Sequence, residues 1–327
     1  MTTRREILIA LGVGVIVTPL AALAQQKGKV WRIGFLGSVS AAANVARLEA
    51  LRAGLRDLGY VEGKNIAIEF RWAEGKYERL PELAAELVRL KVDIIMTHGT
   101  PGSLAAKQAT ATIPIVIATI SDPVATGVVA SLRQPGGNVT GVMFFTQELQ
   151  EKRLEMIREV LPNAKRVAIL TNADNASMKP MIPALEAVAK TLKLELRRFD
   201  VRGPDDFEKS FSAMVAARAD AVVPIEDAML LANDQGMADH ASKRRLPLIA
   251  WKEVAEKGGF LAYGVDFPDM FRRSASYVDR ILKGAKPANL PVERSTKFEL
   301  VINMKSVNAL GVKLPQSVLV RADRVIE

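Results

Sequence analysis

Hydrophobic and polar positions follow two regular patterns along most of the chain. Short apolar runs rich in β-branched residues predict buried strands at 31–36, 92–97 and 114–119. Strict alternation predicts a half-buried strand at 66–72, and apolar residues at helical spacing predict amphipathic helices around 45–58 and 77–90. Strands that alternate with helices in this way indicate an α/β fold built on parallel sheets.

The segment Val92–Gly127 carries the clearest local signals. After one strand, Thr100 and Pro101 stand where a helix N-cap and first helical residue are expected. After the next strand, Ser121, Asp122 and Pro123 repeat the arrangement and predict a second helix start. Parallel strands end at the same sheet edge, where open α/β sheets bind ligands, so both helix N-termini are expected to face a ligand there.

The same order of elements appears twice. From Glu148 onward, apolar runs at 166–170, 194–201, 220–225, 246–249 and 260–263 match those at 32–36, 66–72, 93–97, 113–116 and 139–142. The offset stays near about 130 residues, which is the size of a domain and not of a solenoid repeat. The pattern therefore predicts two lobes of one topology.

The tail does not form a third copy. A helix is predicted at 268–282, a strand at 298–303 and a short helix at 304–310. We interpret them as return crossings. Lobe 1 is then expected at 30–145 plus 268–292, lobe 2 at 146–267 plus 297–327, and a hinge of several strands near 144–147, 263–268 and 293–297.

The N-terminus predicts a signal peptide at residues 1–24. Arg4 and Arg5 precede the apolar run Ile7–Leu23, and an Ala-Leu-Ala sequence ends at Ala24. A membrane anchor is the alternative, but the run is short and contains two glycines and a proline. We expect cleavage near Ala24 and a periplasmic protein, exported by the Sec or the twin-arginine route.

Composition excludes several kinds of site. The chain has no cysteine and two histidines, so it has no disulfide, no thiolate site and no histidine-rich metal site. Its net charge of +9 comes from Lys and Arg interleaved with acids, which indicates solvated helix faces and no nucleic-acid partner. Neither a G-x-G-x-x-G nor a G-x-S-x-G motif is present, so we expect no enzyme, no cofactor and no metal.

Strand ends supply the candidate binding residues. Each of these residue types also has a purely structural interpretation. The serines, Thr100 and Asp122 could cap helices, His98 could be a buried structural residue, and the asparagines could form turns. The acids could lie on an exposed face, and the aromatic residues could pack the hinge. The candidates are Ser38, Ser40, His98, Gly99, Thr100, Ser121, Asp122 and Phe144 in the first half, and Asn172, Asn175, Glu226, Asp227, Trp251, Tyr263 and Asp266 in the second.

These residue types indicate a ligand class. Helix N-termini favour a carboxylate, and acids enclosed on closure need a cation such as an ammonium group. Aromatic side chains would supply apolar walls. Together they predict an amino acid, with aromatic amino acids included. The alternative is a small carboxylic acid, with the acidic residues facing solvent.

Long ordered motifs across the mature chain resemble a known family. IGFLGS, GYVEGKNIAIEFRWAEGKYERLPELAAELV, IPIVIATISDPVATGVVASLRQPGGNVTGV, KRLEMIREVLPNAKRVAIL, YGVDFPDMFRR and RILKGAKPANLPVERSTKFELVINMKSVNALG are similar to ABC transporter substrate-binding proteins of the tryptophan/tyrosine type. The resemblance implies a type I periplasmic-binding-protein fold, with two flavodoxin-like lobes closing on a small ligand.

It also implies a partner, because such proteins deliver their ligand to an ABC permease with a cytoplasmic ATPase. We expect a monomer that binds and transports without chemistry of its own. Two alternatives stay open: a periplasmic sensor or effector-binding domain for a small carboxylate, and an enzyme on a doubly wound sheet.

Overall fold

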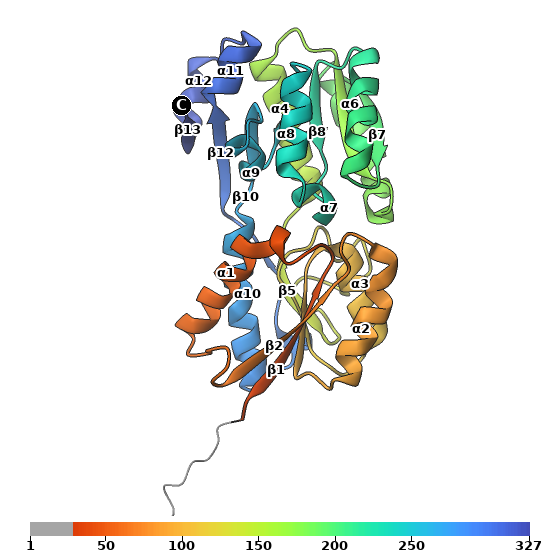
Figure 1. Cartoon of the computed structure of the whole chain (residues 1–327), viewed down its shortest axis with the longest axis vertical. Coiled ribbons are helices and arrows are strands. Elements are labelled where there is room, and N and C mark those ends of the chain that lie inside the picture. Colours follow the sequence, from red (N-terminus) through yellow and green to blue (C-terminus); the bar gives the residue numbers. More distant parts are fainter. Residues whose placement is uncertain (1–28) are drawn as a thin grey trace, which may run out of the picture.

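The structure, a computed structural model, describes residues 29–327 as two lobes stacked along the long axis of the molecule (Figure 1). The predicted signal peptide lies outside these residues. Among the described residues, no helix is long and apolar enough to cross a membrane.

Lobe 1 is built on a six-stranded parallel sheet in the order β11-β5-β4-β3-β1-β2. Its elements are β1 (Trp31–Gly37), α1 (Val45–Asp57), β2 (Ile66–Trp72), α2 (Leu80–Arg89), β3 (Ile94–Thr97), α3 (Gly99–Ala109), β4 (Ile115–Ile117), β5 (Val139–Met143), α10 (Phe267–Leu282) and β11 (Glu293–Arg294).

Lobe 2 has the strand orders β7-β6-β8 and β9-β10-β12-β13, and a bridge from Val222 to Leu248 connects β8 with the start of the second group. Strand β12 runs antiparallel to β10. The elements are α4 (Thr146–Val160), β6 (Arg166–Asn172), α5 (Ile182–Thr191), β7 (Glu195–Val201), α6 (Phe207–Ala216), β8 (Ala221–Pro224), α7 (Ala228–Leu231), α8 (Asp234–Lys243), β9 (Ile249–Ala250), α9 (Lys252–Glu256), β10 (Leu261–Val265), β12 (Phe298–Asn303), α11 (Met304–Leu310), α12 (Gln316–Arg321) and β13 (Arg324–Ile326).

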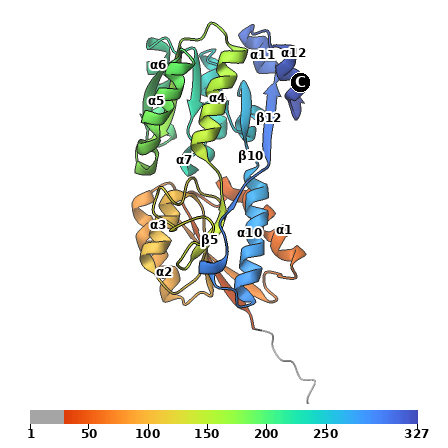
Figure 2. The same ribbon diagram turned by 180° about the vertical axis from the view of Figure 1, so that it is seen from behind.

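Within residues 29–327 the chain passes between the lobes three times, after β5, after β10 and before β12. Figure 2 shows these passages along one side of the molecule. Helix α10 returns to lobe 1 and packs against α1, where a Cβ on Gly54 would lie 2.4 Å from the carbonyl oxygen of Arg272. That close approach requires glycine at position 54.

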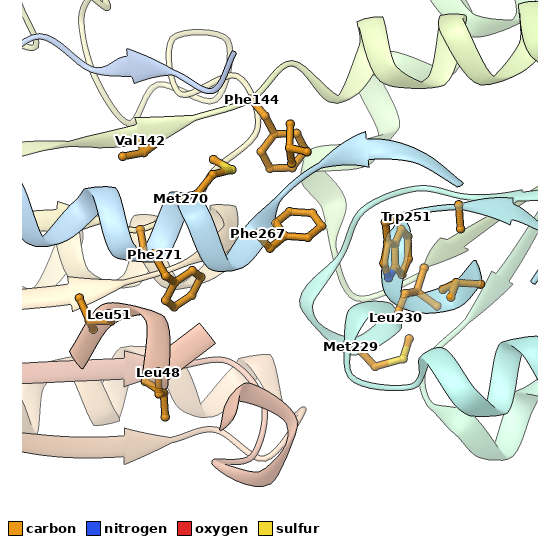
Figure 3. Packing of buried hydrophobic residues seen from close by; sticks show 14 of the residues in the cluster. Leu48, Leu51, Val142, Phe144, Met229, Leu230, Trp251, Phe267, Met270 and Phe271 are labelled. Carbon is orange, nitrogen blue, oxygen red and sulfur yellow. The ribbon is translucent and has the colours of Figure 1, made fainter. Parts of the chain in front are cut away.

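One hydrophobic cluster spans the junction between the lobes. Phe144 and Phe267 pack edge to face, with ring centroids 5.6 Å apart, and continue toward lobe 1. Leu230 and Trp251 extend the same cluster into lobe 2 (Figure 3). Burial of aromatic and aliphatic surface therefore holds the lobes together at the hinge.

The predicted helix after Pro123 is wrong. Its backbone closes a single turn: the Asp122 carboxylate accepts from the N–H groups of Val124 and Ala125 at 3.0 Å, and Val128 N donates to the Pro123 carbonyl at 2.8 Å. Gly127 follows at φ +70°, a left-handed conformation that ends a helical turn. Ser121 therefore does not start a helix.

Candidate functional site

Two adjoining cavities lie between the lobes, beside the end of β3 and the start of α3. Their volumes are about 40 Å³ and about 210 Å³, and both are lined by Thr100, Ser121 and Met178. The smaller one, here called the central cavity, is lined by His98, Gly99, Thr100, Pro101, Thr119, Ile120, Ser121, Phe144, Asn175, Met178, Glu226, Asp227, Ala228, Leu231 and Phe267.

Lobe 1 contributes the first turn of α3 to this cavity. The N–H of Gly99 is already used, because it donates to the Thr119 carbonyl at 2.7 Å. Pro101 has no N–H, so the first-turn amides outside the helix ladder belong to Thr100 and Gly102. A helix N-terminus with these N–H groups favours an anion such as a carboxylate.

His98 lies in the same wall and is buried between Phe35 and Phe271, with ring centroids 6.0 and 5.8 Å away. Within the described residues, its Nε2 has no hydrogen-bond partner. Burial lowers the pKa of His98 to about 3, and the Arg47 charge acts in the same direction. The imidazole is therefore neutral at pH 7.

Lobe 2 contributes Asp227, which is 4% exposed. Asn172 Nδ2 donates to its Oδ1 at 2.9 Å, Asn175 Nδ2 donates to its Oδ2 at 2.8 Å, and the N–H of Met229 donates to Oδ1 at 2.9 Å. Among the described residues, no Lys or Arg forms an ion pair with this carboxylate. Neutral donors satisfy Asp227, and its charge has no counterion.

Tyr77 joins this network from lobe 1. Its hydroxyl lies 3.1 and 3.0 Å from the two Asp227 oxygens and accepts from the N–H of Met229 at 3.2 Å. Burial, followed by the Asp227 charge, raises the pKa of Tyr77 well above its usual value. The phenol therefore stays protonated and donates to the carboxylate.

Glu226 is the adjacent acid and has a different environment. Its Oε1 lies 2.6 Å from Nη2 of Arg153, and the two side chains are 1% and 0% exposed. Gln150 Nε2 donates to Glu226 Oε2 at 3.0 Å, while Arg153 Nε donates to the Tyr263 carbonyl at 2.8 Å. Glu226 thus reaches the cavity already paired with an internal cation.

Several predicted site residues lie away from the central cavity. Asp122 borders the larger cavity and caps its own turn. The indole of Trp251 is fully buried and donates to Asp234 Oδ1 at 2.8 Å. Tyr263 stacks on Phe298, with centroids 6.1 Å apart. These side chains pack the protein at the cleft margin or beneath it.

The remaining predicted residues have structural contacts. Asp266 accepts from the N–H of Asp269 at 3.0 Å, and its carboxylate lies 2.8 Å from Lys297 and 3.4 Å from Lys252. Ser40 accepts from the N–H of Ala43 at 3.3 Å, and Ser38 is fully buried. Asn172 reaches the cavity indirectly, through Asp227.

Sequence reasoning did not find Tyr77, Met178, Arg153 or Phe267 as contributors to the site. Tyr77 fits an amphipathic pattern, and nothing local to it indicates that its hydroxyl reaches the opposite lobe. Arg153 is one of many charged residues on α4, so its burial depends on the docking of β8 and β10. Among residues 29–327, no cluster of three or more His, Cys, Asp or Glu side chains could hold a metal.

A family model for ABC transporter substrate binding proteins matches residues 32–326. A tyrosine-binding protein of Clostridioides difficile (strain R20291) is 28% identical over 260 residues, which cover 79% of this chain and 74% of that one.

Two solved structures are also similar. An ABC domain in complex with L-Trp from Streptococcus pneumonia has a TM-score of 0.83 at 26% identity, covering 91% of this chain and 100% of that chain. The ligand-free, open structure of a substrate binding protein with adhesive properties from Clostridium difficile has a TM-score of 0.65 at 25% identity, covering 91% and 99%.

These matches confirm the fold predicted from the sequence, an α/β type I periplasmic-binding-protein fold with two lobes. They also confirm the predicted function at the level of the family. The chain belongs to the ABC transporter substrate binding protein family, whose members bind solutes.

Proposed function

We propose that this protein binds an L-amino acid, with aromatic amino acids the leading candidates, in the central cavity and the larger cavity that adjoins it between the lobes. The carboxylate would meet the first turn of α3 at Thr100, and the ammonium group would meet Asp227. The single observation that carries the proposal is the pairing, in one cavity, of a helix N-terminus with a buried carboxylate that has no counterion.

Charge supports this orientation. A buried carboxylate without a counterion is costly, and an ammonium group supplies the missing charge. Glu226 is already paired with Arg153, so Asp227 is the acid of this cavity that gains most from a cation. Asp122 gains little, because it lies near solvent and caps a turn.

Shape supports an apolar ligand side chain. Ile120, Phe144, Met178, Leu231 and Phe267 supply apolar walls to the central cavity. Aromatic and thioether side chains suit a planar ring. The C. difficile relative named as tyrosine-binding and the structure with L-Trp are consistent with such a ligand.

The arrangement of the lobes supports enclosure of the ligand. At nearly equal identity, the TM-score is 0.83 to the L-Trp complex and 0.65 to the ligand-free, open relative. Type I binding proteins close by a hinge motion of two lobes. The higher TM-score to the L-Trp complex supports a placement of the lobes that is suited to enclosing a ligand.

Family membership supports the remaining parts of the proposal. The protein would act in the periplasm after removal of residues 1–24, as a binding protein without catalysis. It would deliver its ligand to an ABC permease with a cytoplasmic ATPase.

Calorimetry on the mature chain with L-tryptophan and L-tyrosine tests the proposal. Indole-3-propionic acid lacks the ammonium group, and tryptamine lacks the carboxylate, so both are expected to bind more weakly than L-tryptophan. Asp227→Asn is expected to lose roughly 2–5 kcal/mol of binding free energy, as for removal of one partner of a buried charge pair.

Asp122→Asn is the matched control and is expected to bind as the wild type does. If indole-3-propionic acid binds more tightly than L-tryptophan, the ligand is a small carboxylate and the amino-acid proposal is wrong. Equal affinity of the wild type and Asp227→Asn for L-tryptophan would remove the assigned role of Asp227.

A further inference from the structure

A further cavity lies between the lobes, next to the central cavity. It has a volume of about 590 Å³ and is here called the side cavity. Its lobe 1 wall comes from the start of α1, and its lobe 2 wall comes from α7, α8 and α9. Leu231 lines both cavities, while Phe267 lines the central cavity and the adjacent Pro268 lines the side cavity. The proposed function leaves the side cavity without a role.

Lobe 1 supplies a buried cation to the side cavity. Arg47 lies in the first turn of α1 and is 7% exposed. Its guanidinium carbon lies 5.6 Å from the centroid of the Phe267 ring, and its Nη1 donates to the Ala43 carbonyl at 3.4 Å. Within residues 29–327 no carboxylate forms an ion pair with it. A guanidinium has five N–H donors and binds a carboxylate through two of them, so Arg47 is suited to a ligand carboxylate.

Lobe 2 supplies an acid that has no partner cation. Glu253 lies in the first turn of α9, and its Oε2 is buried without a hydrogen-bond donor among the described residues. The other acid of this wall, Asp234, is satisfied, because it accepts from the Trp251 indole at 2.8 Å and lies 3.6 Å from Lys257 Nζ. Glu253 is therefore the acid of this wall that is suited to a ligand ammonium group.

Arg47 and Glu253 face the same part of the side cavity. Burial raises the pKa of Asp234 to about 6, the Arg47 charge opposes that rise, and the Glu253 charge adds to it. Both charged groups therefore lie near Asp234, yet in the described part of the chain they form no ion pair with each other. Buried charges without partners are costly, so a solute with one positive and one negative group would satisfy both walls.

We infer that the side cavity is a second binding site, for a small solute that carries both a carboxylate and an ammonium group. Arg47 would bind the carboxylate through two N–H groups, and Glu253 would accept from the ammonium group. The charged groups of this site are separate from those of the central cavity, where the acid is Asp227 and the anion meets a helix N-terminus. The inference therefore does not rest on the proposed function.

Nuclear magnetic resonance of the isotope-labelled mature chain tests the inference, with glycine as the probe. The Nε–H signal of Arg47, assigned by its loss in Arg47→Met, reports the side cavity, and the backbone N–H of Thr100 reports the central cavity. Glycine is expected to give a saturable shift of the Arg47 signal in the wild type and in Asp227→Asn alike. Acetate lacks the ammonium group and methylammonium lacks the carboxylate, so each should bind roughly tenfold more weakly or worse.

Two variants remove the charges of the side cavity. Glu253→Gln keeps the volume of the side chain and should weaken glycine binding about tenfold or more, because it removes the partner of the ammonium group. Arg47→Met should weaken it by a similar factor, with the backbone N–H of Ala232, which lines the side cavity, as the reporter. Circular dichroism and the unfolding midpoint show whether each variant is folded.

Each variant has a matched control on the same helix. Glu256→Gln removes an acid of α9 that pairs with Arg324, and Arg52→Met removes a cation of α1 that pairs with Glu62. Neither residue lines the side cavity. Both control variants are expected to bind glycine with the affinity of the wild type.

A shift of the Arg47 signal that does not saturate with glycine would overturn the second site, as would its disappearance in Asp227→Asn. Acetate that binds as tightly as glycine would also overturn the inference, because the occupant would then be a simple anion. Equal losses in Glu253→Gln and Glu256→Gln would remove the assigned role of Glu253. If glycine shifts the Arg47 signal while L-tryptophan and L-tyrosine fail to bind, the proposed ligand is refuted and the second site stands.

Discussion

The two walls of the central cavity differ in charge. The lobe 1 wall contains no charged side chain at the cavity: it offers the first turn of α3, hydroxyl groups and a neutral histidine. The lobe 2 wall contains two adjacent acids, Glu226 and Asp227. The difference gives the cavity one end suited to an anion and one end suited to a cation.

The two adjacent acids of the lobe 2 wall have different environments. Glu226 is neutralised by Arg153, and its donors come from α4, so it fixes the hinge side of lobe 2. Asp227 is held by asparagine side chains, a backbone N–H and a phenol, all without charge. Adjacent residues of the same charge therefore have different partners, a cation for Glu226 and neutral donors for Asp227.

Removal of the buried Arg153 cation should have the largest effect on the free energy of unfolding. Arg153→Met leaves Glu226 buried without a counterion and is expected to lower the free energy of unfolding by roughly 3–5 kcal/mol. Urea denaturation measures the change. The exposed Arg294–Glu148 pair provides the control, because Arg294→Met should cost at most about 1 kcal/mol. Equal losses in the two variants would contradict the distinction between the acids.

The neutral histidine of the lobe 1 wall should be visible in the pH dependence of stability. The folded pKa of His98, about 3, is below its unfolded value of 6.5, so the unfolded chain binds the proton more readily. Stability from this group is complete above pH 6.5 and is lost as pH falls toward 3. Between pH 6.5 and 4.5 the loss should be roughly 2–3 kcal/mol, at about 1.4 kcal/mol per pH unit.

Unfolding midpoints of the wild type and His98→Gln across this range test that expectation, and the variant should show a weaker loss in acid. Asp234 acts in the opposite direction, because burial raises its pKa to about 6. Its stabilisation is present at low pH and is lost as pH rises through 6, so Asp234→Asn should steepen the acid loss. Parallel curves for the wild type and His98→Gln would exclude a buried neutral imidazole.

Asp122 should give the smallest effect. Asp122→Asn keeps an oxygen that accepts from Val124 and Ala125, so stability should change by less than about 0.5 kcal/mol. Asp122→Ala removes the acceptor and should cost about 1 kcal/mol. Thermal unfolding of the three proteins measures both changes. A larger loss in Asp122→Asn would mean that the charge itself matters at this position.

Sequence patterns predicted most of the fold because they depend on local periodicity. Strand β12 and helix α11 begin and end where the apolar pattern places them, at Phe298–Asn303 and Met304–Leu310. The segment after Pro123 shows the limit. The sequence predicted the same capping arrangement there as at Thr100 and Pro101, yet Gly127 and the Asp122 side chain close one turn instead. The predicted start of α3 was also wrong by two residues, because its N-cap is His98 and its first helical residue is Gly99.

The candidate site was less predictable from the sequence, because it depends on which residues of lobe 1 face which residues of lobe 2. Position at a strand end selected His98, Thr100 and Asp227, which the structure brings together around the central cavity. It did not separate Asp227 from Trp251, which also follows a strand but lies beneath the surface with its indole on Asp234. Tyr77 lies in a short 3-10 helix ahead of α2, and only the packing of the two lobes gives its hydroxyl a partner.

The return of α10 to lobe 1 has a consequence for biosynthesis. Helix α1 is among the first elements to be translated, but the helix that covers it begins at Phe267, after most of lobe 2. The edge strand β11 is made later still. A ribosome must therefore release nearly the whole chain before the first lobe can finish folding, so an incomplete translation product cannot assemble a competent cleft.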